Sequence, residues 1–130
     1  MPPTRADRAT EADLPDHANE VRLVGRLAAE AVRRDLPSGD SLVSFRLVVE
    51  RPPARRGDPA GRSSRSPTID TLDCAAWRKD VQRVLARAAA GDVLEVHGAL
   101  RRRFWRTGSG AASRSEVEAA RVRRLKGREA

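Results

Sequence analysis

Hydrophobic and polar residues alternate along several stretches of the chain, and this alternation predicts five β-strands. Successive side chains of a strand point to opposite faces, so alternation marks a sheet that is buried on one side. In the second such stretch Val43, Phe45 and Leu47 share the face that we expect to be buried. The predicted strands cover residues 19–28, 41–51, 69–77, 92–105 and, with a weaker pattern, 115–125.

A helix is predicted between the third and fourth strands, over residues 78–90. Val81, Val84, Leu85 and Ala88 follow the i, i+3, i+4, i+7 spacing of a stripe that faces a core. We expect Gly91 to end this helix in a left-handed cap, because glycine adopts a positive φ without steric cost.

The connections contain turn residues and many arginines. Leu-Pro-Ser-Gly-Asp, residues 36–40, predicts a turn, since proline presets φ and glycine supplies a positive one. A hairpin is expected between the first two strands. Residues 52–68 form a long loop with one acid and four arginines, including Arg55 and Arg56. Long loops in compact domains are usually functional or disordered, so this loop is either a basic flap for a polyanion or a solvated insertion without a role.

Three strands, a helix and two strands predict a mainly β fold, the OB-fold. This is a five-stranded Greek-key barrel with one helix between strands three and four. Its ligands bind across strands two and three and through the loops that follow strands one and four. The arginines expected in these two loops are Arg33, Arg34, Arg106 and Arg114.

Two tryptophans are expected on polar strand faces. In the fourth strand Leu94, Val96, Gly98 and Leu100 form the face suited to a core. The opposite face carries Arg101, Arg103 and Trp105, and Trp77 has the corresponding position in the third strand. Indole and guanidinium planes stack on nucleobases, and arginine neutralises phosphate. The alternative is that these aromatic side chains only cover a neighbouring strand.

The charge of the chain favours a polyanionic partner. The 130 residues include 26 Lys+Arg and 18 Asp+Glu, a net charge of +8. Residues 1–18 hold two arginines and four acids, so the rest of the chain carries +10. Generic arginine richness is the alternative explanation. We expect 1–18 to be a disordered leader, 19–125 to be the binding domain and 126–130 to be a short polar tail.

Composition also indicates the cellular location that we expect and whether catalysis or metal binding is expected. No apolar run is long enough to span a membrane, and no secretory signal is present. The single cysteine, Cys74, fits a reducing, cytoplasmic setting and the core side of a strand. His17 and His97 have no second ligand at metal spacing, so we expect neither catalysis nor a cofactor. Asp70, Asp73 and Asp92 could form the metal cluster of a nuclease, but acids beside strands are commonly solvated or paired with arginine.

Four motifs resemble the bacterial-type single-stranded DNA-binding proteins, in family order and spacing. They are Asn-Glu-Val-Arg-Leu-Val-Gly-Arg-Leu (19–27), Ser-Gly-Asp-Ser-Leu-Val-Ser-Phe-Arg-Leu-Val-Val (38–49), Asp-Cys-Ala-Ala-Trp-Arg-Lys (73–79) and Gly-Asp-Val-Leu-Glu-Val-His-Gly-Ala-Leu-Arg-Arg-Arg-Phe-Trp (91–105). The resemblance implies sequence-tolerant binding of single-stranded DNA by an OB-fold, usually as a homotetramer, in replication, recombination and repair.

The resemblance also implies roles for particular residues. Trp77 and Trp105 match positions where the family stacks aromatic side chains on bases. Arg101 and Arg103 match basic positions before the second of these, and Arg26 is similar to a position near the DNA path. The residues that we expect to bind nucleic acid are Trp77, Trp105, Arg101, Arg103, Arg26, Arg46, Arg55 and Arg56.

Two departures from the family pattern suggest a specialised paralogue. Pro53 and Thr71 stand where family members often have further tryptophans. The chain ends in Lys-Gly-Arg-Glu-Ala, without the acidic tip that recruits partner proteins in the family. Two other functions therefore stay open. The chain could be an RNA-binding OB module, or a paralogue that modulates another single-stranded DNA-binding protein through protein contacts.

Overall fold

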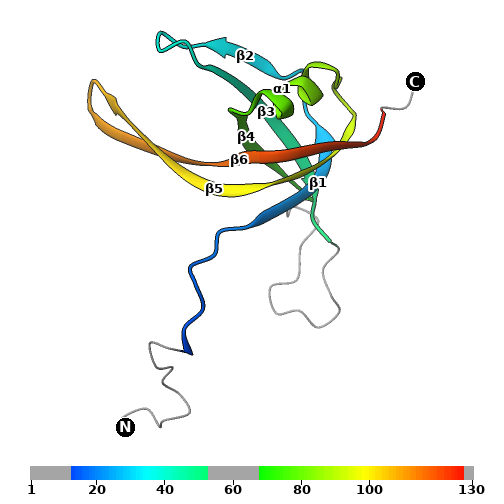
Figure 1. The fold of residues 1–130 in the computed structure, drawn as a ribbon, viewed down its shortest axis with the longest axis horizontal. Helices are drawn as coiled ribbons and strands as arrows, with labels where there is room; N and C mark the ends of the chain where they lie inside the picture. Colours follow the sequence, from blue (N-terminus) through cyan, green and yellow to red (C-terminus); the bar gives the residue numbers. More distant parts are fainter. Residues whose placement is uncertain (1–12, 53–67, 128–130) are drawn as a thin grey trace.

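The computed structural model describes residues 13–52 and 68–127, which form a β-barrel with one helix (Figure 1). A single sheet runs in the order β1-β5-β6-β4-β3-β2, and it closes where β1 also pairs with β3. Its elements are β1 (Val21–Leu27), β2 (Val32–Asp35), β3 (Ser41–Glu50), β4 (Ile69–Ala76), α1 (Lys79–Ala86), β5 (Val93–Thr107) and β6 (Gly110–Lys126). The expected OB-fold is confirmed, with α1 between the third and fourth of the five long strands.

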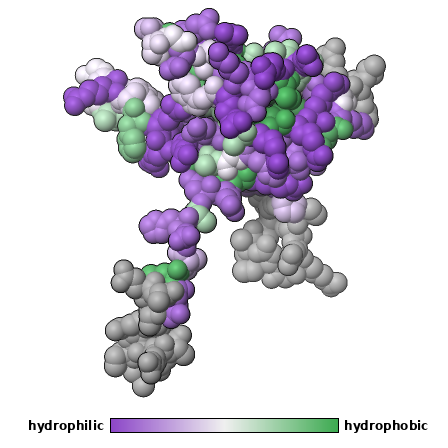
Figure 2. Space-filling view, viewed as in Figure 1, coloured by the Kyte–Doolittle hydropathy of each residue, from purple (hydrophilic) through white to green (hydrophobic). Residues whose placement is uncertain are grey.

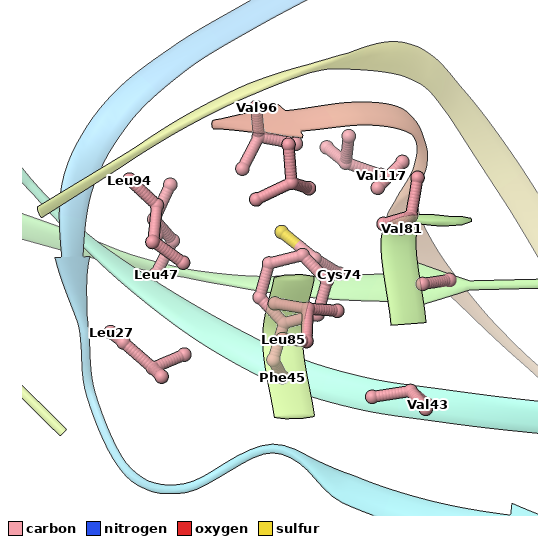
Figure 3. Packing of buried hydrophobic residues seen from close by; sticks show 13 residues of the cluster. Leu27, Val43, Phe45, Leu47, Cys74, Val81, Leu85, Leu94, Val96 and Val117 are labelled. Atoms are coloured by element: carbon pink, nitrogen blue, oxygen red, sulfur yellow. The ribbon is translucent and has the colours of Figure 1, made fainter. Parts of the chain in front are cut away.

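The core lies inside the barrel, where the inward faces of the strands meet α1. The alternation in β3 buries Val43, Phe45 and Leu47, as predicted, and Cys74 lies among them at 2% exposure. Figure 3 shows these side chains packed with residues of β5, β6 and α1. Each large apolar side chain that is fully buried contributes about 1.5–3 kcal/mol. The remaining core residues are Leu27, Ala76, Val81, Leu85, Leu94, Val96, Val117, Ala119 and Val122.

The partner of β3 in its hairpin is β2, a strand that the sequence did not reveal. The turn at residues 36–40 is present, with the Leu36 amide donating to the Asp40 carbonyl at 2.8 Å and Gly39 at φ 92°. The predicted hairpin between β1 and β3 is reduced to two residue pairs at the end of β1. All four residues of β2 are exposed, so no hydrophobic alternation indicated a strand there.

The helix is shorter than predicted, and Gly91 does not end it. α1 stops at Ala86, and the buried carboxylate of Asp92 accepts a hydrogen bond from the Ala89 amide at 2.8 Å in the turn that follows. Gly91 has the expected positive φ of 93°, but its amide donates to the Leu27 carbonyl at 2.8 Å. The glycine therefore fastens the turn before β5 to β1. Within the described residues, no helix has the length and apolar character needed to cross a membrane.

β5 and β6 form a long hairpin whose outer half leaves the barrel (Figure 1). Leu100, which was predicted to face the core, is 50% exposed because the hairpin departs at this point. Its backbone is held by the Asn19 side chain, which donates to the Leu100 carbonyl at 2.7 Å. Arg106 and Arg114, expected in a loop, lie instead in β5 and β6, since only Gly108 and Ser109 form the turn.

Two glycines permit close contacts between strands. A Cβ on Gly25 in β1 would clash with the Val48 carbonyl oxygen, because the two strands approach closely here. A Cβ on Gly98 in β5 would clash with the Glu118 carbonyl oxygen, beside a bulge between β5 and β6. These contacts bring β3 against β1 and β6 against β5.

Candidate nucleic-acid interface

The outward side of β3, β4 and the β5–β6 hairpin gathers most of the residues that the sequence singled out; we call it the outer face. Cross-strand partners share one side of a sheet, and Arg46 of β3 pairs with Asp73 of β4. Arg103 of β5 pairs with Arg114 of β6. Arg26 lies opposite Val48, two residues along β3 from Arg46 and on the same side. Strand register therefore places these arginines on a common surface.

Trp77 follows the last residue of β4 and is half-buried beside the hairpin. The guanidinium carbon of Arg103 lies 5.1 Å from the centre of its ring, a distance at which a cation is attracted to an aromatic face. This contact joins the end of β4 to the hairpin.

Trp105 lies two residues beyond Arg103, on the same side of β5, where the hairpin extends past the barrel. Its cross-strand neighbour is Ala112, and the tryptophan is 46% exposed. A small neighbour leaves room above the indole ring. Phe104, at 73% exposure, is on the opposite side of the hairpin, with the guanidinium of Arg102 at 6.0 Å from its ring.

The arginines of the outer face are already paired with acids. Arg46 donates from Nε to Asp73 at 2.9 Å, Arg101 donates from Nε to Glu118 at 2.9 Å, and Arg26 meets Glu50 at 3.4 Å. All three arginines are substantially exposed. Exposed pairs of this kind are worth about 0–1 kcal/mol, so a phosphate can compete for the guanidinium groups.

Glu116 is the buried acid of this surface, at 5% exposure. Its carboxylate is ion-paired with Arg103 and lies 3.6 Å from Arg114. One carboxylate thus holds two arginines in place, and the group of three keeps a net positive charge.

A depression of about 350 Å³ lies on the outer face between the barrel and the hairpin. The arginines that line it are Arg34 of β2, Arg46 of β3 and Arg114 of β6, with Asp73 and Glu116 between them. The sequence had placed Arg34 and Arg114 in loops, because neither the strand β2 nor the length of the hairpin was visible in its pattern. Knowledge of the strand register would have placed both arginines, Arg34 and Arg114, in strands.

Two of the expected binding residues, Arg55 and Arg56, lie outside the described residues. In the described part of the chain, no group of three or more histidine, cysteine, aspartate or glutamate side chains is arranged to hold a metal ion.

Burial, with Asp73 nearby, raises the pKa of the Cys74 thiol to about 12. Cys74 is therefore a core residue, as expected, and has little thiolate character at neutral pH.

The closed barrel defines an OB-fold protein, and the comparisons with known proteins identify its family. The family model "Single-strand binding protein family" matches residues 18–125, so the chain belongs to this family. A single-stranded DNA-binding protein of Halalkalibacterium halodurans is 30% identical over 92 residues, 71% of this chain and 51% of that protein. The chain therefore spans about half the length of this curated relative.

A solved structure shows the same fold. The Plasmodium falciparum SSB, in a structure titled as its complex with ssDNA, superposes with a TM-score of 0.71 at 19% sequence identity. The match covers 87% of this chain and 99% of that chain. The barrel and its helix are thus the architecture shared with that protein.

Proposed function

We propose that this chain binds single-stranded DNA on the outer face, without strong dependence on sequence. The observation that carries the proposal is the arrangement of Trp77 and Trp105 on either side of Arg103, along one side of the hairpin. Bases stack on the two indoles, and each stacked base contributes about 1–3 kcal/mol whatever its identity. Every base has a π-face, so this mode of binding tolerates sequence.

Phosphates meet the arginines of the outer face. Arg46 and Arg101 donate to their acids from Nε, which leaves their terminal amino groups able to donate to phosphate oxygens. Arg34 lines the same depression and has no acidic partner among the described residues. The mechanism requires no bond making or breaking and no cofactor.

Family membership and the earlier resemblance support a wider proposal. We assign binding to residues 19–125, and we place the protein in replication, recombination or repair in the cytoplasm, as a homo-oligomer. A relative that is named a single-stranded DNA-binding protein supports this assignment. The mass of the native assembly in solution tests the homo-oligomer, and a mass equal to one chain would contradict it.

The first test is the quenching of tryptophan fluorescence by single-stranded oligo-dT, compared with a duplex of equal length. The chain has only two tryptophans, Trp77 and Trp105, so the signal reports on the two proposed stacking positions. We expect strong quenching by the single strand and little by the duplex. Measured at two salt concentrations, the logarithm of the binding constant should fall with the logarithm of the salt concentration, with a slope of about −0.7 per phosphate neutralised.

Two outcomes would contradict the proposal. An equal response to single strand and duplex would mean that the tryptophans are structural and that only charge attracts the nucleic acid. Stronger competition by a matched RNA oligomer than by DNA would favour the RNA-binding alternative, since stacking and charge do not by themselves distinguish the sugar.

A further inference from the structure

The exposed side of α1 carries cations that the outer face does not account for. Lys79, Arg83 and Arg87 are four residues apart, so they lie along one side of the helix and its C-terminal cap. All three are exposed, and none has an acidic partner among the described residues. The acid on this helix, Asp80, is paired with Arg78 at 3.1 Å.

Two depressions continue this row of cations across the neighbouring strands. One, of about 320 Å³, is lined by Arg33 of β2 together with Lys79 and Arg83. The other, of about 390 Å³, is lined by Arg83, Arg87 and Arg124 of β6, together with Val84 and the acid Asp80. Since Arg83 belongs to both, the cations form one continuous surface, which we call the α1 track. It consists of Arg33, Lys79, Arg83, Arg87 and Arg124. The two cations outside α1 have acidic partners: Arg33 is paired with Asp35 at 3.2 Å and Arg124 with Asp92 at 3.4 Å.

The α1 track gives the fold itself little net stabilisation. Like charges at i, i+4 on a helix destabilise it by a few tenths of a kcal/mol, about 0.2–0.5 per pair. The helix dipole disfavours the positive charge of Lys79, the first residue of α1, but favours those of Arg83 in the last turn and Arg87 at the C-terminal cap. The helix is held in the fold by the buried side chains of Val81 and Leu85, so the cations add nothing to its packing. Their arrangement fits the binding of an anion better than a structural role.

The track begins where the outer face ends. Trp77 and Arg78 line one groove together, and Lys79 follows them directly in the chain. The three helix cations span about 12 Å at 1.5 Å per residue. None of the described residues that line the two depressions is aromatic, so the surface can neutralise phosphates but cannot stack bases.

We propose that the α1 track binds the phosphate backbone of single-stranded DNA that continues past Trp77, as an extension without base stacking. The inference rests on the proposed function, because the strand reaches α1 from the outer face. A short oligomer fills only the outer face, whereas a longer one also reaches Arg83 and Arg87. The track therefore increases affinity and salt dependence only for long strands.

The test compares short and long oligo-dT, about 8 and about 35 nucleotides, a choice guided by OB-fold site sizes of roughly 4–16 nucleotides. The full chain carries Arg83→Gln, Arg87→Gln or both, and Arg121→Gln is the matched control. Arg121 is exposed on β6, outside the track, and has no acidic partner among the described residues. Unfolding curves and native masses are compared first, and we expect them to be unchanged.

For the long oligomer, each α1 substitution should reduce the salt slope by about 0.7, and the pair should weaken binding about tenfold or more at 50 mM salt. Binding of the short oligomer should be the same in every variant as in wild type. The control Arg121→Gln should bind both oligomers as wild type does. Failure of the wild-type protein to bind the short oligomer would defeat the proposed function. Normal short-oligomer binding with equal long-oligomer affinities in wild type and double variant would defeat the track alone. A loss of affinity that the α1 substitutions cause only with duplex, or equally with short and long oligomers, would also overturn the proposed role of the α1 track.

Discussion

Two aromatic side chains, neighbours in sequence but on opposite sides of the hairpin, allow the stacking role to be tested at a single residue. Trp105→Ala should weaken binding of single-stranded oligo-dT by about 1–3 kcal/mol, the contribution of one stacked base. Phe104→Ala is the control, because Phe104 is equally aromatic and more exposed but faces away from the outer face. Titration with a labelled oligomer measures both affinities, and similar losses would contradict the stacking role of Trp105.

The acids of the outer face are expected to limit its affinity. Asp73 holds the Nε of Arg46 at 2.9 Å, so Asp73→Asn should release the guanidinium and tighten binding severalfold at low salt. Asp16→Asn removes the same charge from an exposed position before β1, and it should have a smaller effect. Salt-dependent titrations of both variants decide the question. Equal gains would show that only the net charge of the chain matters.

At the scale of an element, Gly98 determines how closely β5 approaches β6. Gly98→Ala places a methyl group against the Glu118 carbonyl, and such overpacking typically costs about 1–3 kcal/mol. Gly108→Ala, in the open turn of the same hairpin with nothing within 4 Å, should change stability little. Urea unfolding gives both free energies, and a well-tolerated Gly98→Ala would mean that the strands separate easily.

Glu95 joins three strands and should make their association dependent on pH. It accepts hydrogen bonds from Arg22 of β1 at 2.7 Å and from Arg123 of β6 at 3.2 Å, and His97 lies 3.4 Å away. The hydrogen bond from Arg22 is the largest cause that holds the pKa of Glu95 below its ordinary value of 4.5. A lowered pKa in the folded state stabilises the fold above the unfolded-state value and loses that effect as pH falls through the folded-state value.

Glu95→Gln should therefore be less stable than wild type near pH 7, and the difference should decrease as pH falls below 4.5 through the lowered pKa of Glu95. Urea unfolding of both proteins between pH 3 and pH 7 measures it. A difference that stays constant across this range would mean that packing, rather than charge, explains the effect.

The elements that the sequence revealed are those with one buried face. Val43, Phe45 and Leu47 alternate with polar residues because the barrel buries them, and the register follows from that alternation. β2 was missed because all of its residues are exposed. The tip of the hairpin, residues 106–107 of β5 and 110–114 of β6, was missed because neither side of it faces the core. Hydrophobic alternation therefore identified the barrel but not the projections that shape its surface.

For the whole molecule, the sequence indicated on which strand face each candidate binding residue lies better than it indicated the partners of these residues. Strand periodicity placed Trp77 and Trp105 on polar faces. The pairing of Arg46 with Asp73 depends on strand register and could not be inferred from composition. Hydrophilic residues cover most of the face in Figure 2, yet many of the charges cancel in pairs. The net charge of +8 is therefore a poor guide to where the proposed binding surface lies.

The two-pair junction of β1 with β3 has a consequence for how the chain folds. The β5–β6 hairpin can grow from its two-residue turn through 15 residue pairs. The β1–β3 junction has only two pairs, Arg26–Val48 and Leu27–Leu47, and therefore adds few contacts. We expect barrel closure to be the last step of folding. Val48→Ala at the junction should mainly accelerate unfolding, and Val96→Ala in β5 should mainly slow refolding. Stopped-flow kinetics in urea would show the reverse pattern if the barrel closes before the hairpin forms.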